Sequence, residues 1–521
     1  MTHQRRTADR NDQAEVIAFL ADPSSYVGVD QVERFETHGN LVFLAGSEAW
    51  KIKRAVRFSY MDFSTLEKRA AACAREMEVN HRLAPELYLG CVPITRAGDG
   101  TLAFGGSGDI VEWAVHMRRF DQSALLSSIA SAADIRANLA KAVADTVYDS
   151  HRAATRASPI SGSAQMAQLV TSLGEVLARS QVFDAEDVSR FSRDAQGQLR
   201  RTQSLLDARA LHGCVRRCHG DLHLGNIVLW QGRPTLFDAI EFDEKIATTD
   251  TLYDLAFLLM DLDRYRQKPA ANIVLNHYLW RSREELDLQG LQALPLFLGL
   301  RASIRAMVTV DRAAQEDSTT AEANRERAAA YLHAAVGYLA PQPPQLIAIG
   351  GLSGTGKTTL AAGLAPGFSP TPGAIHLRSD LERKALFGVE ETTRLAAQSY
   401  SPKTNKTVYE ILCKKAHLAL AAGQSVVADA VYSEPDERSN IEAVACSLGV
   451  QFRGLWLTAK DVQQLVARIA ARRNDASDAT PNLVADQQTW NTGALSQVWT
   501  TIDAGAGPDE TRRRALAALG C

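Results

Sequence analysis

Residues 351–358, which read GLSGTGKT, have the plainest chemistry in this chain of 521 residues. The apolar run 347–349 precedes them and the helical pattern Thr359-Leu-Ala-Ala follows, so the loop joins an expected strand to an expected helix. Glycines let backbone N–H groups surround a phosphate, and the start of a helix adds its positive dipole end. We therefore expect a nucleotide-binding loop rather than an ordinary glycine-rich turn. The expected ATP-binding residues are Gly351, Ser353, Gly354, Thr355, Gly356, Lys357, Thr358 and Thr359.

Within this loop, two side chains have separate expected roles. Lys357 would neutralise the β- and γ-phosphates, and the hydroxyl of Thr358 would be a ligand of Mg²⁺. Asp429 ends an expected strand over 425–428, which suits Mg²⁺ or its water shell, although an acid there can also cap the next helix. The sequence thus predicts a magnesium site formed by Thr358 and Asp429.

Charged side chains elsewhere in this half of the chain have the spacing of an acceptor site. Asp380 follows an expected strand over 375–379 and would act as catalytic base on an acceptor hydroxyl. Arg383 lies one helical turn further and would hold an anionic group of the acceptor. Arg468 and Arg472 lie on a basic helix end and are expected to close over the phosphates of ATP, the alternative being an ordinary solvated face.

A second group of catalytic residue types lies between residues 219 and 238. It reads His219-x-Asp221, then Asn226, then Asp238. An Asp on a loop can accept the proton of an incoming hydroxyl, while an Asn and a second Asp can hold Mg²⁺ against nucleotide phosphates. The alternative is that Asp221 is a turn residue and His219 a buried, hydrogen-bonded histidine. The pattern favours phosphoryl transfer.

The motifs HGDLHLGN at 219–226 and LFDAIEFD at 236–243 resemble the loops of a known fold. They are similar to the catalytic and metal-binding loops of the aminoglycoside phosphotransferase and choline kinase branch of the protein-kinase-like fold, over roughly residues 30–335. The resemblance implies that Asp221 is the catalytic base. It implies that Asn226 and Asp238 are the metal ligands.

The same resemblance implies an ATP-binding lysine on the third strand, paired with a glutamate on the next helix. Lys51 fits best, because Ala49 stands two residues before it, and Lys53 on the same face stays open. Glu76 is the expected partner and Glu78 the second candidate.

Three acids near these motifs are expected to have no part in the chemistry. Thr251-x-x-Asp254 precedes an apolar run and has the pattern of a helix-capping box, which predicts a structural role for Asp254. Glu241 and Asp243 follow Asp238 closely and are expected to be solvated loop charges.

Residues 345–521 resemble the P-loop small-molecule kinases, such as gluconate and shikimate kinases, and also the polynucleotide and zeta-toxin-type kinases. The tandem resembles a bacterial family of predicted bifunctional kinases. That resemblance implies ATP and Mg²⁺ as cofactors, and transfer of the γ-phosphoryl group to hydroxyls of small-molecule acceptors at both sites. In one alternative, one domain is a regulatory ATP-binding module for the other. In another, the P-loop domain is a polynucleotide or zeta-toxin-like kinase.

The elements that must position these residues fall into two expected domains. The first, 1–339, is an α+β protein-kinase-like domain with a small lobe at about 25–118 and a helical lobe at about 119–339. Its small lobe has a hairpin pattern turning at 38–40, a third strand at 49–53 and a helix at 65–83. A proline-rich linker, 340–345, leads to the second domain, 346–521, an α/β P-loop domain with a parallel sheet. Its expected strands are 346–349, 375–379, 425–428, 452–457 and 499–502.

The amino-acid composition limits which partners and which cellular location we expect for the protein. The formal net charge of −3 gives no support to a nucleic-acid partner. The seven cysteines are scattered, which predicts a reducing cytoplasmic location rather than a disulfide framework. No apolar run of membrane-spanning length is evident, so no membrane partner is expected.

Overall fold

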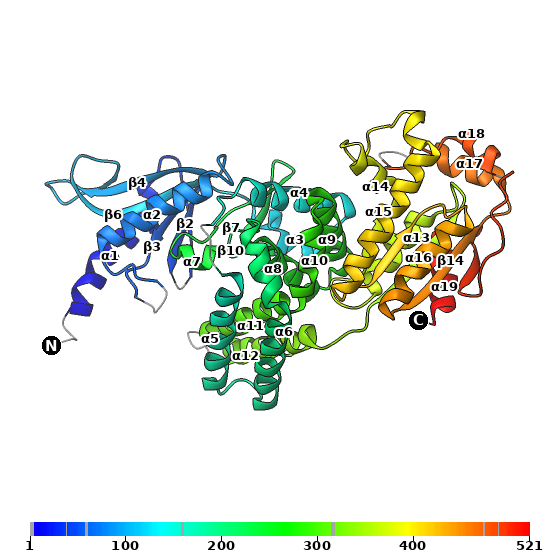
Figure 1. The fold of residues 1–521 in the computed structure, drawn as a ribbon. Helices are drawn as coiled ribbons and strands as arrows, with labels where there is room; N and C mark the ends of the chain where they lie inside the picture. The colour runs from blue at the N-terminus through cyan, green and yellow to red at the C-terminus, as the bar shows by residue number, and fades with distance from the viewer. Residues whose placement is uncertain are drawn as a thin grey trace. The chain divides into compact units, whose positions relative to one another are not determined.

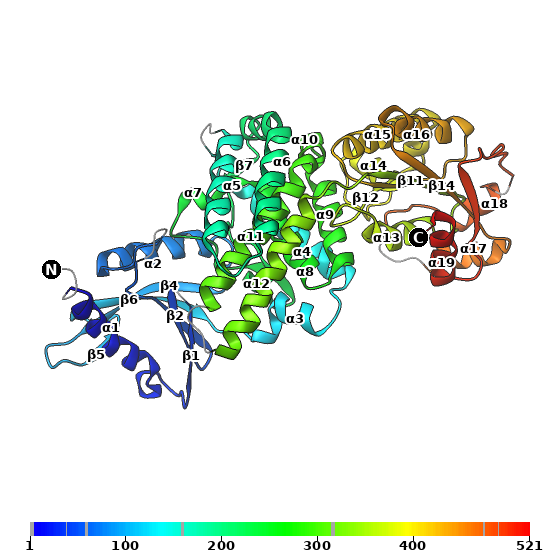
Figure 2. The same ribbon diagram turned by 90° about the horizontal axis from the view of Figure 1, so that it is seen from below.

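The structure, a computed structural model, describes residues 5–37, 39–57, 61–157, 161–313, 318–471, 475–487 and 489–520. The chain packs as two compact units (Figures 1 and 2). Unit 1 comprises Met1–Ile135, Asp149–Ser158 and Gly213–Leu258, and unit 2 comprises Arg136–Tyr148, Pro159–His212 and Leu259–Cys521. The domain boundary expected at 340–345 lies within unit 2 and stays a prediction. The first residue of the expected turn at 38–40, His38, and the predicted Arg472 are outside the described residues.

The amino-terminal part of unit 1 is an antiparallel sheet of six strands in the order β1-β2-β3-β6-β4-β5. The strands are β1 (Val32–Glu36), β2 (Asn40–Ala45), β3 (Glu48–Lys53), β4 (Tyr88–Arg96), β5 (Leu102–Phe104) and β6 (Asp109–Arg118). Helix α1 (Arg5–Ala21) precedes them, and α2 (Leu66–His81) packs on the sheet after Thr65, whose hydroxyl accepts the N–H of Lys68. The predicted hairpin, third strand and helix are all confirmed.

In the described part of unit 1, two short ribbons and four α-helices follow this sheet along the chain. Strand β7 (Val215–Arg217) pairs with β10 (Thr248–Asp250), and β8 (Ile227–Trp230) pairs with β9 (Arg233–Leu236). The helices are α3 (Leu126–Ala132), α7 (Glu244–Ala247), and parts of α4 (Ala137–Ala153) and α8 (Thr251–Arg264). The turn at Gln231-Gly232 has φ of 49° and 79°, as a tight hairpin requires.

Long helices form the first part of unit 2. Figure 1 shows α5 beside α6 and α11 beside α12. The helices are α5 (Gly162–Arg179), α6 (Ala185–Leu211), α9 (Lys268–Ser282), α10 (Glu285–Gly290), α11 (Leu294–Ala313) and α12 (Ser318–Leu339). One helical stretch, Glu285–Asp311, is apolar and long enough to cross a membrane, but 67% of its most apolar window is buried inside the structure. That burial is the usual setting of a core helix.

The second part of unit 2 is a parallel sheet of five strands in the order β12-β13-β11-β14-β15. They are β11 (Gln345–Gly351), β12 (Ile375–Arg378), β13 (Val426–Asp429), β14 (Gln451–Thr458) and β15 (Trp499–Asp503), and all five predicted strands are confirmed. In Figure 2, α15 and α16 lie on one face and α13 and α19 on the other. The helices are α13 (Lys357–Leu364), α14 (Ser379–Leu386), α15 (Pro402–Ala421), α16 (Pro435–Leu448), α17 (Val462–Ala470), α18 (Pro481–Gln487) and α19 (Pro508–Leu519).

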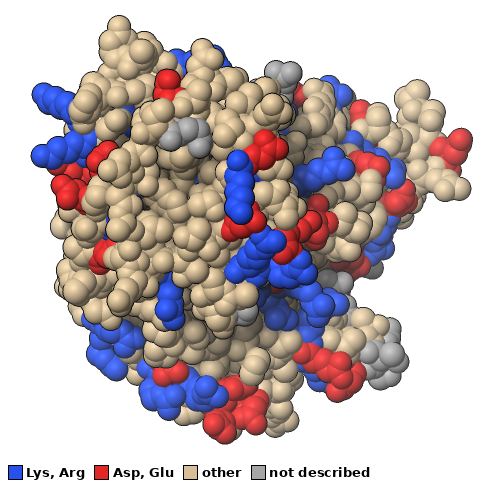
Figure 3. Space-filling model, turned by 90° about the vertical axis from the view of Figure 1, so that its right-hand side faces the viewer, with Lys and Arg blue, Asp and Glu red and all other residues tan. Residues whose placement is uncertain are grey.

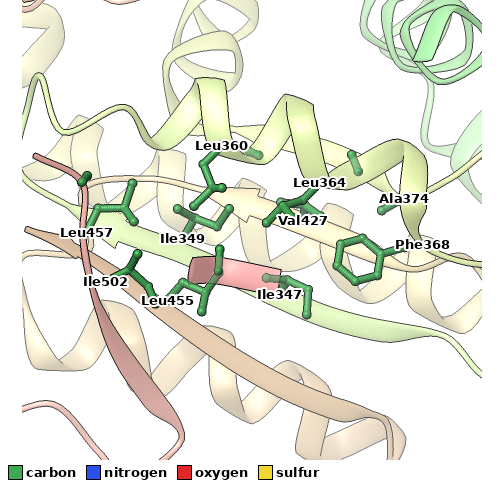
Figure 4. Close-up of a cluster of buried hydrophobic side chains, with 14 residues drawn as sticks. Ile347, Ile349, Leu360, Leu364, Phe368, Ala374, Val427, Leu455, Leu457 and Ile502 are labelled. Carbon is green, nitrogen blue, oxygen red and sulfur yellow. The ribbon is translucent and has the colours of Figure 1, made fainter. Parts of the chain in front are cut away.

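The core under α13 fixes the phosphate-binding loop at both ends. Ile347 and Ile349 of β11 pack against Leu360 and Leu364 of α13 (Figure 4). All four side chains are buried, and burying each contributes about 1.5–3 kcal/mol. Because strand and helix are anchored on each other, the five-residue connection between them, 352–356, has little freedom.

Candidate active sites

In unit 1, two neighbouring lysines of β3 share one carboxylate of α2. Lys51 Nζ lies 2.8 Å from Glu76 Oε1 and 2.5 Å from Asp238 Oδ1. Lys53 Nζ lies 2.6 Å from Glu76 Oε2 and also pairs with Glu241. Lys53 and Glu76 are fully buried, whereas the side chain of Asp238 is 42% exposed. Lys51 is therefore the lysine that reaches the expected metal ligand, while Lys53 is enclosed.

The charges of this network set its protonation. Burial alone would lower the pKa of Lys51, but the carboxylates of Asp238 and Glu76 outweigh it and raise that pKa well above its usual value. Burial would raise the pKa of Glu76, but Lys51 and Lys53 hold it below its usual range. Both groups therefore stay charged, as a lysine held ready for phosphate requires.

Asp221 and Asn226 meet in the loop before β8. Asn226 Nδ2 donates to Asp221 Oδ2 and to its backbone oxygen, each at 3.0 Å. The register of β8 and β9 brings Phe237 N–H to 3.1 Å from Asn226 O, so Asn226 and Asp238 stand at the same end of one hairpin. The three residues predicted from the motifs thus come from one compact loop structure.

Asp254 of α8 holds the backbone of this loop. Its carboxylate accepts the N–H of His219 at 3.2 Å and that of Gly220 at 2.9 Å, and it lies 3.1 Å from His151 Nε2. Asp254 thus acts as a clamp that holds the backbone of a loop distant in sequence, whereas at the start of α8 it is Asp250 that accepts the N–H of Leu252. His219 is buried and its Nε2 lies 2.9 Å from Phe237 O, so it is the enclosed histidine of the alternative interpretation. Burial lowers the pKa of His219, which favours its neutral form.

The segment that carries Asp238 is held on the opposite side by α2 and β4. Asn80 donates to Ala239 O and accepts the N–H of Ala239, while the N–H of Asp238 donates to the hydroxyl of Tyr88. Asp238 has a φ of 60°, a left-handed conformation that an Asp tolerates better than most residues. These contacts fix where the Asp238 carboxylate points.

The side chains at this site fit a hard divalent cation. Magnesium takes oxygen ligands. Asp238 offers a partly exposed carboxylate. Asn226 uses its Nδ2 toward Asp221, so the other end of the amide, Oδ1, is the end presented to a ligand.

In unit 2, the backbone of the P-loop has the conformation that its glycines predict. Gly351, Gly354 and Gly356 have φ of 134°, 84° and 92°, which side chains rarely adopt. A Cβ at Gly354 would also stand 2.9 Å from the backbone oxygen of Leu465. Lys357 Nζ donates to Leu352 O at 3.0 Å, so the ammonium lies within the loop.

A cavity of about 890 Å³ joins this loop to the predicted acceptor residues. It is larger than a phosphate group needs and matches the size of pockets that enclose small molecules. Its lining includes the loop and the predicted catalytic, metal and acceptor residues, namely Ser353, Gly354, Thr355, Gly356, Lys357, Thr358, Thr359, Asp380, Arg383, Asp429 and Arg468. The structure thus brings together every described residue predicted for this site except Gly351.

Two acids of this cavity have opposite protonation tendencies. Burial, only partly offset by Arg378, raises the pKa of Asp380, and the charge of Asp429 adds to the rise. Asp429 is buried, which alone would raise its pKa. Its Oδ2 lies 2.9 Å from His376 Nε2, and this contact together with the charges of Arg378 and Lys357 lowers that pKa. Asp429 does not cap the next helix, since Glu434 holds the N-cap position of α16. Paired environments that separate two pKa values are typical of acid–base sites.

The predicted arginines differ in how firmly they are held. Arg383 is buried, donates to Ser399 O at 2.8 Å and lies 4.5 Å from the ring centre of Tyr400. Arg468 donates to Ala504 O at 2.9 Å. Both line the cavity, and Arg472 is outside the described residues. Their predicted contacts with substrate and ATP stay predictions.

Some residues of these sites were not expected from the sequence. Glu241, expected to be solvated, is nearly buried and pairs with Lys53, so that expectation is wrong; burial raises the pKa of Glu241. Asp243 caps α7 by accepting the N–H groups of Lys245 and Ile246. Gln487 was missed altogether, although its Oε1 accepts the N–H of Ser353 at 2.7 Å. No sequence signal marks the contacts of Glu241 and Gln487, because each joins segments far apart in the chain.

One buried cluster outside the predicted sites brings together His151, Cys218 and Asp254. Its ligand atoms lie within 4.8 Å of one another. Both oxygens of Asp254 already accept backbone N–H groups, so the cluster serves the loop clamp described above.

The surface in Figure 3 carries acidic and basic side chains side by side, with wide neutral areas between them. No continuous basic stripe crosses this face among the residues drawn in colour.

Comparison with known proteins agrees with the two folds described above. Residues 37–291 match the model of the phosphotransferase enzyme family, and residues 346–492 match that of an AAA domain. The chain is 31% identical over 475 residues to the protein Rv2004c of Mycobacterium tuberculosis (strain ATCC 25618 / H37Rv), a match covering 88% of this chain and 90% of the relative. The protein Mb2027c of Mycobacterium bovis gives the same values.

Two solved structures are similar to separate parts of the chain. A choline/ethanolamine kinase family protein from Mesorhizobium loti is 14% identical, covers 63% of this chain and 99% of its own, and has a TM-score of 0.37. A gluconokinase from Sinorhizobium meliloti 1021 is 18% identical, covers 35% and 94%, and has a TM-score of 0.25. These likenesses are distant and carry no argument about the substrate.

The fold and the sites define a transferase of the kinase type, in which a phosphotransferase-family domain precedes a P-loop nucleotide-binding domain. Within that class, the chain belongs to the family of the mycobacterial proteins Rv2004c and Mb2027c.

Proposed function

We propose that the protein is an ATP- and Mg²⁺-dependent phosphotransferase with two active sites, each transferring the γ-phosphoryl group to a hydroxyl of a small-molecule acceptor. One observation carries the proposal: a single cavity of about 890 Å³ in unit 2 is lined by the phosphate-binding loop, by Asp380 and by Arg383. Phosphoryl transfer needs a phosphate cradle, a base and an acceptor pocket that open onto the same space.

In the second site, Asp380 accepts the proton of the acceptor hydroxyl as the hydroxyl oxygen attacks the γ-phosphorus. The bond from that phosphorus to the bridging oxygen of the β-phosphate breaks, and ADP leaves. Lys357 leaves the carbonyl of Leu352 and binds the β- and γ-phosphates. Thr358 and Asp429 hold Mg²⁺, which when bound neutralises charge on the phosphate oxygens. Arg383 orients an anionic group of the acceptor from its buried position, and Arg468 approaches the phosphates.

In the first site, Asp221 is the base and Lys51 binds the ATP phosphates. Glu76 keeps the Lys51 ammonium charged and directed toward the Asp238 side of the site. Asn226 and Asp238 hold the metal, and the hydrogen bond from Asn226 Nδ2 keeps the Asp221 carboxylate beside them. The two sites use different backbone chemistry for one reaction class.

The test is a screen for Mg²⁺-dependent ADP release by the full chain against pools of small hydroxyl-bearing metabolites. Asp221→Asn and Asp380→Asn are the variants, because each replaces a base with an amide of the same shape. We expect each substitution to abolish one acceptor-dependent activity and to leave the other within about twofold. The proposal is overturned if neither change affects phosphoryl transfer with any acceptor.

The same variants test the regulatory alternative. If Asp221→Asn removes no reaction of its own but changes turnover at the P-loop site, the first site is a regulatory ATP-binding module. Phosphorylation of an oligonucleotide 5′-end, lost in Asp380→Asn, would instead identify a polynucleotide kinase.

A further inference from the structure

One peptide unit of the phosphate-binding loop is held from both sides. Its carbonyl oxygen, that of Leu352, accepts from Lys357 Nζ at 3.0 Å, and its N–H, that of Ser353, donates to Gln487 Oε1 at 2.7 Å. Carbonyl and N–H point in opposite directions in a trans peptide, so Lys357 and Gln487 stand on either side of it. Gln487 is thus one peptide away from the ammonium that would bind the terminal phosphates.

Gln487 is buried, so its carboxamide is expected to be fully hydrogen-bonded. The side chain is the last of α18, is 2% exposed and lines the cavity. A buried amide that lacks partners is costly, so a glutamine at this depth is expected to use both ends of its carboxamide. One end is accounted for by Ser353.

The contact also fixes the direction of the carboxamide. A backbone N–H only donates, so the end that meets Ser353 is the oxygen, and the two N–H donors of Nε2 belong to the other end. The Ser353 N–H, occupied by Gln487, is not available to a phosphate. The Nε2 group of Gln487 can therefore donate to a phosphate in place of the Ser353 N–H. This donor lies one side-chain length further into the cavity than the backbone group.

We propose that Gln487 recognises the terminal phosphoryl group: its Oε1 fixes the Leu352–Ser353 peptide, and its Nε2 donates to the γ-phosphate of bound ATP. This inference rests on the proposed nucleotide-binding function of the P-loop site. It assigns α18 to the discrimination of triphosphate from diphosphate. A donor aimed at the γ-phosphate has no partner when ADP is bound.

Substitution by glutamate separates the two roles of the side chain. Gln487→Glu retains an oxygen for the N–H of Ser353 but places a negative oxygen where Nε2 stood. We expect its affinity for the non-hydrolysable triphosphate AMPPNP to fall at least tenfold, with its affinity for ADP within about twofold of the parent. Gln487→Leu removes both contacts and should lose AMPPNP affinity and thermal stability together.

The measurement is calorimetric titration of full chains with Mg²⁺ and either nucleotide. All chains carry Lys51→Met, so that only the P-loop site titrates; Glu76 keeps Lys53 as a partner in that background. Gln463→Glu, an exposed glutamine of α17 that does not line the cavity, is the matched control for added charge. Thermal melting of each chain reports folding.

The outcomes are distinct. If the Lys51→Met chain binds neither nucleotide, the proposed function fails at this site. If it binds both and Gln487→Glu keeps the parent's ratio of AMPPNP to ADP affinity, the assignment of Gln487 is overturned. An equal loss of both nucleotides in Gln487→Glu overturns it too, since a merely structural glutamine would act in that way.

Discussion

At the scale of single residues, the first site depends on how one carboxylate is shared. Glu76 accepts from Lys51 through one oxygen and from Lys53 through the other. The two lysines nevertheless have different second partners, because Lys51 reaches Asp238 and Lys53 reaches Glu241. Substitution of Lys51 should therefore affect mainly nucleotide binding, and substitution of Lys53 mainly folding stability.

Lys53→Met leaves Glu241 buried without its cation, and removing one partner of such a pair costs about 3–5 kcal/mol. We expect a loss of that order in urea unfolding at neutral pH. The loss should shrink as pH falls, because protonated Glu241 no longer carries the unpaired charge. Lys51→Met, the matched control, should destabilise less and abolish nucleotide binding at this site. Equal stability losses in the two variants would contradict this division.

The raised pKa of Asp380 makes a prediction about pH. A base acts only when it is ionised. Turnover at the P-loop site should therefore be lost, as pH decreases, at a higher pH than an ordinary carboxyl would give.

The contribution of Asp380 to folding stability has the opposite dependence on pH. With the folded pKa above the unfolded one, the folded state binds the extra proton, so this group's contribution to stability falls as pH rises through that window. Asp380→Asn should therefore stabilise the chain at neutral pH while abolishing turnover, as urea midpoints and ADP release would show; a destabilised variant would be contrary evidence.

At the scale of elements, α8 positions a loop that it does not belong to. Asp254 is fully buried and accepts two backbone N–H groups of the 219–220 loop. Asp254→Asn would turn an N–H donor toward one of them. Since hydrogen bonds to charged groups contribute about 1.5–3 kcal/mol, we expect that loss in unfolding free energy and at least tenfold slower turnover at the first site.

Asp243→Asn is the control for the Asp254 substitution. Asp243 caps α7, and asparagine is an equally good N-cap, so stability and turnover should stay near the parent values. Unchanged turnover in Asp254→Asn, with the expected loss of stability, would show that the clamp does not position the catalytic loop.

Substitution by alanine should change the stability of the protein in opposite directions at two glycines of unit 2. A Cβ at Gly454 of β14 would stand 2.2 Å from Trp499 Cδ2, and Trp499 is buried, so Gly454→Ala should cost about 1–3 kcal/mol. Gly337 of α12 is exposed with no atom within 4 Å of a Cβ, so Gly337→Ala should stabilise by about 0.5–1 kcal/mol. Urea midpoints check both; a stabilised Gly454→Ala chain would contradict the packing at β14.

At the scale of the whole molecule, the two sites predict nucleotide stoichiometry. Calorimetry with AMPPNP and Mg²⁺ should give two nucleotides bound per chain. Lys357→Ala and Lys51→Met should each reduce the value to one, because each removes the lysine of a different site. The double variant should bind none. A parent chain that binds one nucleotide would refute the two-site assignment.

Much of this arrangement was predictable from local patterns. The glycines and lysine at 351–358, and the spacing from Asp221 to Asp238, predict strand–loop–helix and hairpin contexts that the structure confirms. Lys51 and Glu76 also meet, although the sequence left Lys53 open. Contacts such as Gln487 with Ser353 were not predictable, because their residues are 134 positions apart and no periodicity links them. Glu241 was wrongly expected to be solvated, because charged residues are rarely buried unless they are paired and its partner, Lys53, is far away in the sequence.

The order of the parallel sheet also affects the chain while it is being made. Strand β11 lies at the centre, between β13 and β14, which begin only at Val426 and Gln451. A ribosome adding about 5–20 residues per second needs roughly 4–15 s to advance from Gly351, the end of β11, to Val426, the start of β13. During this time the strand that leads into the phosphate-binding loop has left the ribosome with both edges open. Open edges pair readily with other chains. Premature termination before β14 should therefore yield nascent chains that aggregate or occupy chaperones, and the damage in the cell would exceed the simple loss of one enzyme.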